Sequence, residues 1–227
     1  VGLGFTTTPN FFDSAYAAGQ ISSPVFAIQL QASALNSLLY FNGLPTEVVI
    51  PDIRSPVSNW ALGKACVTQQ VQLIGFNVNG VDMTGYSASY AIVDSGTSLF
   101  FLNQYLYDQI TNQYFQGCNI YSSSIQCPCS MTSSFPNFTF YFQGAKTYIY
   151  NTNYTIGCSA MFGPISDLGG ILLGDTFMRN YIVTFDKGNS QVGFKGYSVW
   201  LTQRTRDNLS CRLVRTEYFY IGEIVMT

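Results

Sequence analysis

The stretch Ala91-Ile-Val-Asp-Ser-Gly-Thr-Ser-Leu-Phe100 decides how this chain is interpreted. Its first three residues predict a strand that is buried on both faces, and Asp94 stands at the end of that strand. A carboxylate in such a place is tolerated only where hydrogen-bond donors meet it. Three of the next four residues carry hydroxyl groups, and Gly96 permits a tight turn back toward the carboxylate. The stretch predicts a functional site, although the pentad alone is also typical of an ordinary turn between two strands.

A second stretch favours the functional interpretation. It begins at Ile171-Leu-Leu-Gly174, runs to Val192-Gly-Phe194, and starts about eighty residues after the first. In this order and at this separation, the two stretches resemble the C-terminal lobe of the pepsin-like aspartic proteases. In that family the first motif holds a catalytic aspartate, and the hydrophobic-hydrophobic-Gly segment runs beside it. The resemblance implies an all-β, pepsin-like acid protease fold, mainly the C-terminal lobe, with a few short helices.

The resemblance also divides the chain into three parts. Residues 1–57 correspond to the remainder of the N-terminal lobe and the inter-lobe strands, and residues 58–194 to the C-terminal lobe. Family members usually end soon after this point, so residues 195–227 form an extension of unknown structure. The extension is either a solvated tail or an erroneous terminus of the gene model. Because the first residue is Val1 and the resemblance begins in mid-fold, we expect the chain to be part of a longer protein.

Local patterns predict several individual elements. Phe11 to Gly19 has helical spacing with a glycine stop, and Ser23 to Leu30 matches a strand of the family. The alternating segment Gln70 to Gly80 ends in Asn-Gly, which indicates a hairpin. Asn103 to Tyr114 predicts a helix with Asn103 as its cap, and the aromatic residues of Phe135 to Phe142 predict a core strand.

Composition excludes several classes of function. Charged residues make up only 10% of the 227 residues, and the net charge of -2 argues against a nucleic-acid partner. The sequence has no histidine and no Gly-x-Ser-x-Gly element, which argues against a Ser-His nucleophile. The Cys-Pro-Cys motif has no matching second pair, so we expect no metal site and no cofactor. No apolar run reaches the ~20 residues that a membrane span requires.

Six cysteines indicate an oxidising compartment. The resemblance implies a disulfide between Cys129 and Cys158, and Cys118 with Cys127 is a plausible local bridge. The remaining two cysteines, Cys66 and Cys211, have no obvious counterpart in the family.

Three Asn-x-Ser/Thr triplets are glycosylation acceptors if the chain is secreted, although such triplets also arise by chance. They begin at Asn137, Asn153 and Asn208. Together with the cysteines they predict the secretory pathway, with an extracellular or a lysosome- or vacuole-like acidic destination.

The resemblance assigns a role to each residue of the first motif. Asp94 is the catalytic aspartate of the second lobe, and Gly96 donates its backbone N–H to the carboxylate. Ser95 supplies an inter-lobe hydroxyl contact, and Thr97 hydrogen-bonds the outer carboxylate oxygen. Ile92, Leu172 and the Thr97-Ser98 edge line the substrate cleft. Asp175 and Arg179 lie four residues apart after Gly174, and we interpret them as a structural pair.

Peptide hydrolysis in this family uses two aspartates, one from each lobe, and this chain contains a single Asp-[Ser/Thr]-Gly motif. A peptide or protein substrate therefore requires a second lobe from the same precursor, from a separate chain, or from a homodimer that pairs two Asp94 side chains. The enzyme hypothesis is an aspartic endopeptidase. The alternatives are a catalytically inactive peptide-binding or inhibitory protein on the same scaffold, or a non-functional gene fragment.

Overall fold

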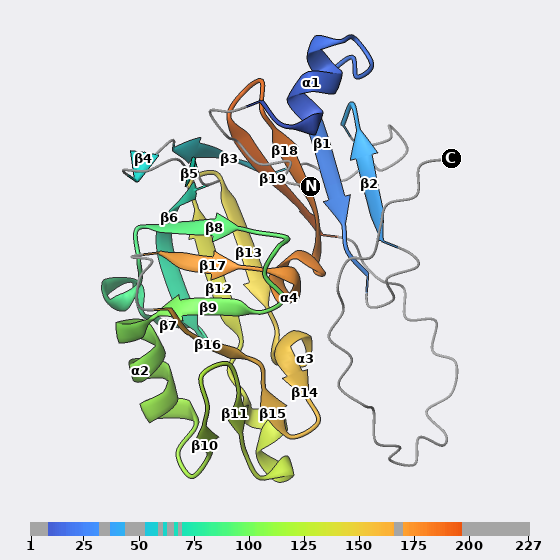
Figure 1. The fold of residues 1–227 in the computed structure, drawn as a ribbon. Helices are drawn as coiled ribbons and strands as arrows, with labels where there is room; N and C mark the ends of the chain where they lie inside the picture. The colour runs from blue at the N-terminus through green and yellow to red at the C-terminus, as the bar shows by residue number, and fades with distance from the viewer. Residues whose placement is uncertain are drawn as a thin grey trace.

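The structure is a computed structural model that describes residues 9–31, 37–43, 53–58, 61–62, 66–67, 70–165 and 170–196. For residues 53–67 only the backbone elements are described. Strands dominate the described part of the chain, and the helices are few and short (Figure 1). The all-β, pepsin-like prediction is confirmed. Residues 197–227 lie outside the described residues, and so does most of the expected C-terminal extension.

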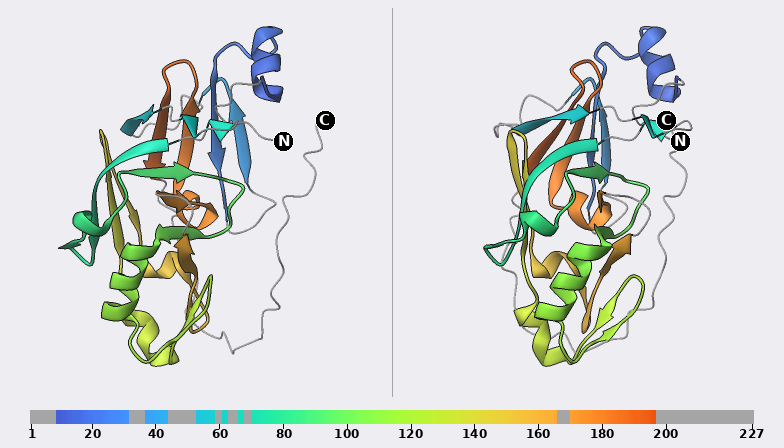
Figure 2. Two further views of the ribbon diagram at one scale, coloured as in Figure 1. Left: turned by 60° about the vertical axis from the view of Figure 1, so that its left-hand side comes forward. Right: turned by 90° about the vertical axis from the view of Figure 1, so that its left-hand side faces the viewer.

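One large sheet organises the described residues, and its main path joins ten strands in the order β16-β9-β17-β8-β6-β3-β19-β18-β1-β2. The two views of Figure 2 show that this path bends, so that β1, β2, β18 and β19 stand at one end of the molecule. The bounds are β1 (Val25–Gln29), β2 (Leu38–Phe41), β3 (Ile53–Ser58), β6 (Gln70–Val78), β8 (Tyr90–Val93), β9 (Phe100–Asn103), β16 (Phe162–Ile165), β17 (Ile171–Leu173), β18 (Tyr181–Asp186) and β19 (Gln191–Gly196).

Shorter strands extend this framework. A branch from β6 adds three strands to the large sheet, and two small sheets stand apart from it. The branch contains β7 (Val81–Asp82), β12 (Phe138–Phe142) and β13 (Ala145–Ile149), the four-stranded sheet contains β10 (Asn119–Ile120), β11 (Ile125–Gln126), β14 (Thr155–Ile156) and β15 (Ser159–Ala160), and the two-stranded sheet contains β4 (Ala61–Leu62) and β5 (Cys66–Val67).

The hairpin predicted at Asn79-Gly80 joins β6 to β7. Both turn residues have positive φ, 50° at Asn79 and 82° at Gly80, which suits a tight hairpin turn. The backbone N–H of Asn79 also donates to the carbonyl of Asn137, and Asn79 Oδ1 accepts from the N–H of Asn137. The turn therefore also anchors the start of β12.

Aromatic residues fill the core between β9, β12 and β16. Phe100 stacks on Phe162 with ring centroids 5.0 Å apart, and Phe138 packs edge-on against both rings. All three side chains are fully buried. Burial of each such side chain contributes roughly 1.5–3 kcal/mol. The prediction that the aromatic residues of Phe135 to Phe142 belong to the core is confirmed for the four phenylalanines, whereas Tyr141 is half-buried.

Helix α1 (Phe11–Ala17) packs on the end of the sheet formed by β1, β2, β18 and β19 (Figure 1). Asn10 caps it, because its side chain accepts from the N–H of Asp13 at 3.2 Å. Phe12 is buried against Phe26 of β1, and Lys187 forms an ion pair with Asp13 at 2.5 Å. These contacts tie the helix to the strands that follow it much later in the sequence.

Helix α2 (Gln104–Tyr114) begins where predicted, but the predicted cap is wrong. The side chain of Asn103 makes no cap hydrogen bond. Its Nδ2 instead donates to the carbonyl of Tyr86 at 3.1 Å. Tyr86 belongs to a 3₁₀ turn, Thr84–Tyr86, that packs near the helix, so the Asn103 amide turns toward this tertiary acceptor and its Oδ1 accepts no N–H from the helix. The remaining helical turns are η3 (Cys129–Ser134), α3 (Asn151–Tyr154) and α4 (Asp175–Met178).

Candidate active site

The turn that follows β8 holds the carboxylate of Asp94 with two donors. The backbone N–H of Gly96 donates to Asp94 Oδ1 at 2.9 Å, and the hydroxyl of Thr97 donates to Oδ2 at 2.7 Å. The N–H of Thr97 also donates to the Asp94 carbonyl at 3.3 Å. Each carboxylate oxygen thus has a donor from within three residues. These are the two contacts that the resemblance implies for Gly96 and Thr97.

Strand β17 fixes this turn from the side. It runs parallel to β8 with Leu172 opposite Ile92, and antiparallel to β9 with Leu172 opposite Phe101. The N–H of Asp94 donates to the carbonyl of Leu173 at 3.0 Å, which continues the β8–β17 ladder to the carboxylate residue itself. The three neighbouring strands lie side by side in Figure 1. Asp94 is therefore positioned by strands that are distant in sequence.

The residues after β17 close the other side of the turn. The N–H of Gly174 donates to the Leu99 carbonyl at 3.1 Å, and the N–H of Asp175 donates to the Thr97 carbonyl at 2.7 Å. A Cβ atom on Gly174 would lie 2.0 Å from the Thr97 carbonyl oxygen. Only glycine allows the two backbone segments to approach this closely.

Thr176 adds a further contact to the same turn. Its N–H and its hydroxyl both donate to the carbonyl of Ser98, at 3.2 and 3.1 Å. The turn that carries Asp94 is held by hydrogen bonds at both of its ends, which suits a site whose geometry must be preorganised.

Asp175 is a second acidic group in this region, and we interpreted it from the sequence as part of a structural pair only. Burial raises the pKa of its carboxyl to about 6, the Arg179 guanidinium opposes that rise, and the charge of Asp94 adds to it. Asp175 Oδ1 is buried and accepts no hydrogen bond within the described residues. The sequence interpretation of Asp175 did not include this environment, although Asp175 stands two residues after an apolar strand, much as Asp94 stands directly after another.

The expected cleft-lining residues differ in exposure. Ile92 is buried, Leu172 is half-buried, and Ser98 is exposed. Ile92 and Leu172 are neighbours in the parallel pair β8–β17, and Ser98 lies on the turn itself. Ser95 is half-buried and makes no hydrogen bond within the described residues, so its hydroxyl remains available.

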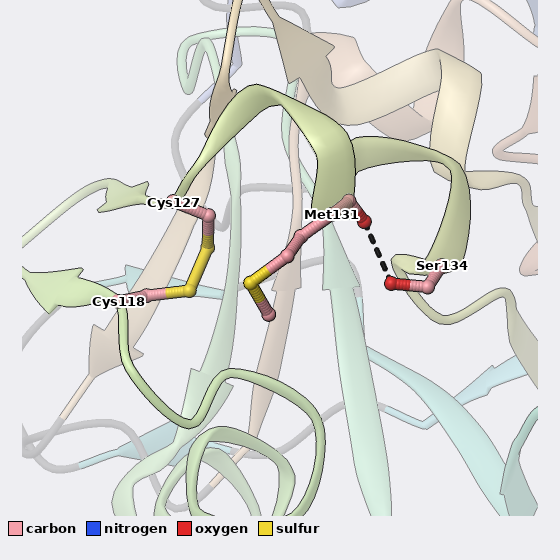
Figure 3. The surroundings of a disulfide bond; sticks show 4 residues. All are labelled: Cys118, Cys127, Met131 and Ser134. Carbon is pink, nitrogen blue, oxygen red and sulfur yellow. Dashed lines mark hydrogen bonds between the residues drawn. A yellow bond between two sulfur atoms is a disulfide. The ribbon is translucent and has the colours of Figure 1, made fainter.

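Two disulfides cross-link segments next to the four-stranded sheet formed by β10, β11, β14 and β15. Cys118 pairs with Cys127, and Cys129 pairs with Cys158. These are the pairs expected from the sequence. Figure 3 shows the side chain of Met131 extending beside the first bridge. The N–H of Cys127 donates to the carbonyl of Cys158 at 3.1 Å, so the two bridges join adjoining segments. The side chain of Cys66, and Cys211, lie outside what the structure describes.

Two of the three candidate glycosylation residues, Asn137 and Asn153, are exposed, and Asn208 lies outside the described residues. Asn137 Oδ1 accepts from the N–H of Asn151 at 2.8 Å, and Asn153 Oδ1 accepts from the N–H of Tyr150 at 2.7 Å. Both carboxamides therefore lie at the turn that leads into α3.

In the described part of the chain, no group of three or more acidic, cysteine or histidine side chains could hold a metal ion. Among the same residues, no helix has the length and apolar character needed to cross a membrane.

Comparison with known proteins places the chain among related sequences. Residues 1–196 match the family model described as eukaryotic aspartyl protease. Pepsin A of Rhinolophus ferrumequinum is 26% identical over 191 residues, which cover 80% of this chain and 48% of that protein. Cathepsin E-A of Xenopus laevis is 27% identical over 217 residues, covering 85% and 51%. Gastricsin of Oryctolagus cuniculus is 29% identical over 189 residues, covering 78% and 47%. The chain spans about half the length of the curated relatives it matches.

Proposed function

Since the chain belongs to the eukaryotic aspartyl protease family, we propose that it supplies one of the two catalytic aspartates of an aspartic endopeptidase, and that Asp94 is that aspartate. The observation that carries the proposal is the turn after β8. A carboxylate at the end of a buried strand is met there by the Gly96 N–H and the Thr97 hydroxyl. A scaffold that served only to bind peptides would need no carboxylate in this position.

In the proposed mechanism, Asp94 works with a second aspartate from another lobe. Two adjacent carboxylates share one proton, because ionising both is costly. The ionised member takes a proton from a bound water, which attacks the scissile carbonyl, while the protonated member donates its proton to the carbonyl oxygen. The contacts from Gly96 and Thr97 hold the Asp94 carboxylate in a fixed orientation for this exchange.

We assign supporting roles to the neighbours of Asp94. Ser95 would contact the opposite lobe through its free hydroxyl, which has no partner among the described residues. Leu172 and Ser98 would border the bound peptide beside Thr97, with Ile92 packed next to Leu172 in the sheet. Asp175 is not positioned to touch the peptide, because its Oδ1 is buried.

The second lobe is the missing partner in this proposal. The chain covers 47 to 51% of the three relatives described above, so a first lobe of similar size remains to be accounted for. We propose that residues 58–194 form the C-terminal lobe, that residues 1–57 are the end of the N-terminal lobe with the inter-lobe strands, and that the rest of the N-terminal lobe comes from the same precursor. A separate chain or a homodimer would meet the same chemical requirement.

We also propose that the protein is made in the secretory pathway and acts outside the cell or in an acidic compartment of the lysosome or vacuole type. The two disulfides support this location, because such bonds persist in oxidising compartments.

The test is to obtain the full-length precursor from the transcript upstream of Val1 and to assay peptide cleavage in acid, with and without pepstatin. We expect pepstatin-sensitive cleavage. Asp94→Asn should lower kcat/KM by at least about 10³-fold, since removing an essential acid-base group removes a contribution of that order. The matched control is Asp82→Asn, which changes an exposed carboxylate that hydrogen-bonds only Thr84. This control should keep the activity of the parent.

Two results would contradict the proposal. Activity that survives Asp94→Asn would exclude Asp94 as a catalytic group. A full-length product that binds peptide without cleaving it would favour the non-catalytic alternative, and the same test on the 227-residue chain would show whether a homodimer suffices.

A further inference from the structure

The carboxamide of Asn153 is held in a defined orientation at the surface. The N–H of Tyr150 donates to Asn153 Oδ1 at 2.7 Å, and the N–H of Asn153 donates to the Tyr150 carbonyl at 2.9 Å. These two bonds fix the side chain against Tyr150. Asn153 Nδ2 makes no hydrogen bond within the described part of the chain, and Asn153 itself is exposed. The nitrogen atom that would carry an N-linked glycan is thus free while the oxygen is engaged.

The residue whose backbone N–H holds this carboxamide, Tyr150, carries an exposed aromatic ring. Tyr150 is 53% exposed, which is high for so large an aromatic residue. Its ring stacks on that of Tyr148 with centroids 5.9 Å apart and planes 9° from parallel. Lys146 Nζ lies 5.3 Å from the Tyr148 ring centroid on the same strand. The Tyr148 ring therefore packs against the Tyr150 ring, Lys146 lies over the Tyr148 ring, and much of the Tyr150 ring remains in water.

We propose that Asn153 carries an N-linked glycan whose first N-acetylglucosamine packs its apolar C–H face on the ring of Tyr150. The proposal rests on the secretory-pathway location proposed above. In the covalent step, a host transferase joins C1 of the sugar to Asn153 Nδ2; Nδ2 loses one proton, and the lipid-linked pyrophosphate leaves. Oδ1 does not react, so its hydrogen bond from Tyr150 is retained.

Stacking should stabilise the glycosylated protein, because it removes an exposed aromatic ring from water. An aromatic face and the C–H face of a sugar can exclude water between them, and the hydroxyl groups of both remain solvated at the edges. Because the carboxamide and the ring are attached to the same short turn, little chain freedom is lost when they meet.

Asn137 is a second acceptor residue at the same turn. It is also exposed, and its Oδ1 also accepts a backbone N–H, that of Asn151. The aromatic residues that flank it in sequence, Phe135 and Phe138, are buried. The antiparallel register of β12 and β13, with Phe138 opposite Ile149, nevertheless brings Asn137 toward Tyr150, so a glycan at Asn137 could compete for the same ring and the test must remove that triplet.

The test uses the 227-residue chain secreted from a eukaryotic host behind a signal peptide. Thr139→Val and Ser210→Ala remove the other two acceptor triplets and leave Asn153 alone. Mass spectrometry of the glycopeptide should show Asn153 occupied. The same chain secreted from cells whose N-glycan synthesis is blocked, which keeps Asn153 as asparagine, should show a fall in Tm of about 2 °C, the size expected for one aromatic contact in a protein of this length.

The contribution of the ring is measured by repeating this comparison in variants of Tyr150. Tyr150→Phe should keep the fall in Tm, and Tyr150→Ala should abolish it. The matched control is Tyr121→Ala, because Tyr121 is also 53% exposed and lies on the β10–β11 turn rather than beside Asn153. That variant should show the same fall as the parent. Nuclear Overhauser contacts between the Tyr150 ring protons and the sugar give a second measurement that does not depend on a melting transition.

An unoccupied Asn153 in the secreted chain would overturn the proposal. So would an equal fall in Tm in Tyr150→Ala, or the absence of ring-to-sugar contacts. None of these measurements involves peptide cleavage. An inactive full-length protein with an occupied, stacked glycan would therefore refute only the proteolytic function, and an active one with a bare Asn153 would refute only this inference.

Discussion

Asp94 and Asp175 each follow a buried apolar strand, and the two strands, β8 and β17, are parallel neighbours. Their carboxyl groups nevertheless have different surroundings. Asp94 has a donor on each oxygen, from Gly96 and Thr97. Asp175 Oδ1 is buried with no donor among the described residues, and burial raises the pKa of its carboxyl to about 6. The comparison shows that two acids near the ends of adjacent strands can differ, one with a donor on each carboxylate oxygen and the other with a buried oxygen that has no donor among the described residues.

The turn that carries Asp94 and the segment that carries Asp175 are also linked by hydrogen bonds. Asp175 donates its backbone N–H to the Thr97 carbonyl, and Thr97 in turn donates its hydroxyl to Asp94. The buried acid, Asp175, therefore supports the turn through its backbone, and the charge of Asp94 helps to raise the pKa of its side chain. Substitutions in the two regions should separate these contributions.

The largest loss of stability is expected from Gly174→Ala, which would push the segment after β17 away from the turn that carries Asp94. The added Cβ would lie 2.0 Å from the Thr97 carbonyl oxygen and 2.3 Å from that of Leu99. Both obstacles are backbone atoms, so relief requires a shift of the turn. We expect a loss of at least about 3 kcal/mol in the free energy of unfolding, measured by chemical denaturation of the 227-residue chain.

The matched control for this variant is Gly85→Ala. No atom lies within 4 Å of a Cβ built on Gly85, and its φ is not in the left-handed region. Its effect should stay within about 0.5 kcal/mol. If the two substitutions cost the same, the close packing of β17 against the Asp94 turn would not be a source of stability.

A smaller effect is expected from Asp175→Asn, and it should depend on pH. The unfolded chain ionises Asp175 above about pH 4, whereas the folded chain keeps the proton until about pH 6, because burial raises the pKa. The folded state therefore binds more protons in this window, and the free energy of unfolding falls as pH rises through it. The carboxyl is only partly buried, so solvent screening limits the loss to about 1–2 kcal/mol.

Asp175→Asn should remove this slope, because asparagine does not titrate. Denaturation midpoints measured at intervals from pH 4 to pH 7 provide the check. An unchanged slope in the variant would show that the buried carboxyl does not retain its proton in the folded chain.

The elements that the sequence predicted are those with local signals. Asn79 and Gly80 both adopt the positive φ that a two-residue hairpin needs, and that preference is intrinsic to these residues. Helix α2 was predictable from its spacing. The cap at Asn103 was not, because its side chain bonds the carbonyl of Tyr86, a residue 17 positions away. This hydrogen bond depends on tertiary packing, which the local sequence pattern does not predict.

The same distinction applies to the candidate site. The donors to Asp94 lie within three residues of it, so the motif itself predicts them. The burial of Asp175 and the effect of the Asp94 charge on its pKa arise from the pairing of β8 with β17, whose first residues, Tyr90 and Ile171, are far apart in the chain. The local sequence shows that Asp175 follows an apolar strand, as Asp94 does, but it does not show how deeply the acid at the start of helix α4 is buried.

The smallest effect is expected from Ser95→Ala. The Ser95 hydroxyl makes no hydrogen bond among the described residues, so its loss should change the free energy of unfolding of the 227-residue chain by less than about 0.5 kcal/mol. Thr97→Val, two residues away, removes the donor to Asp94 Oδ2 and should cost roughly 1–2 kcal/mol. In the full-length protein, Ser95→Ala should have a larger effect, because its hydroxyl would then contact the other lobe. A substitution that is silent in the half-length chain and destabilising in the full-length one would identify Ser95 as a contact between lobes, whereas equal silence in both would remove that role.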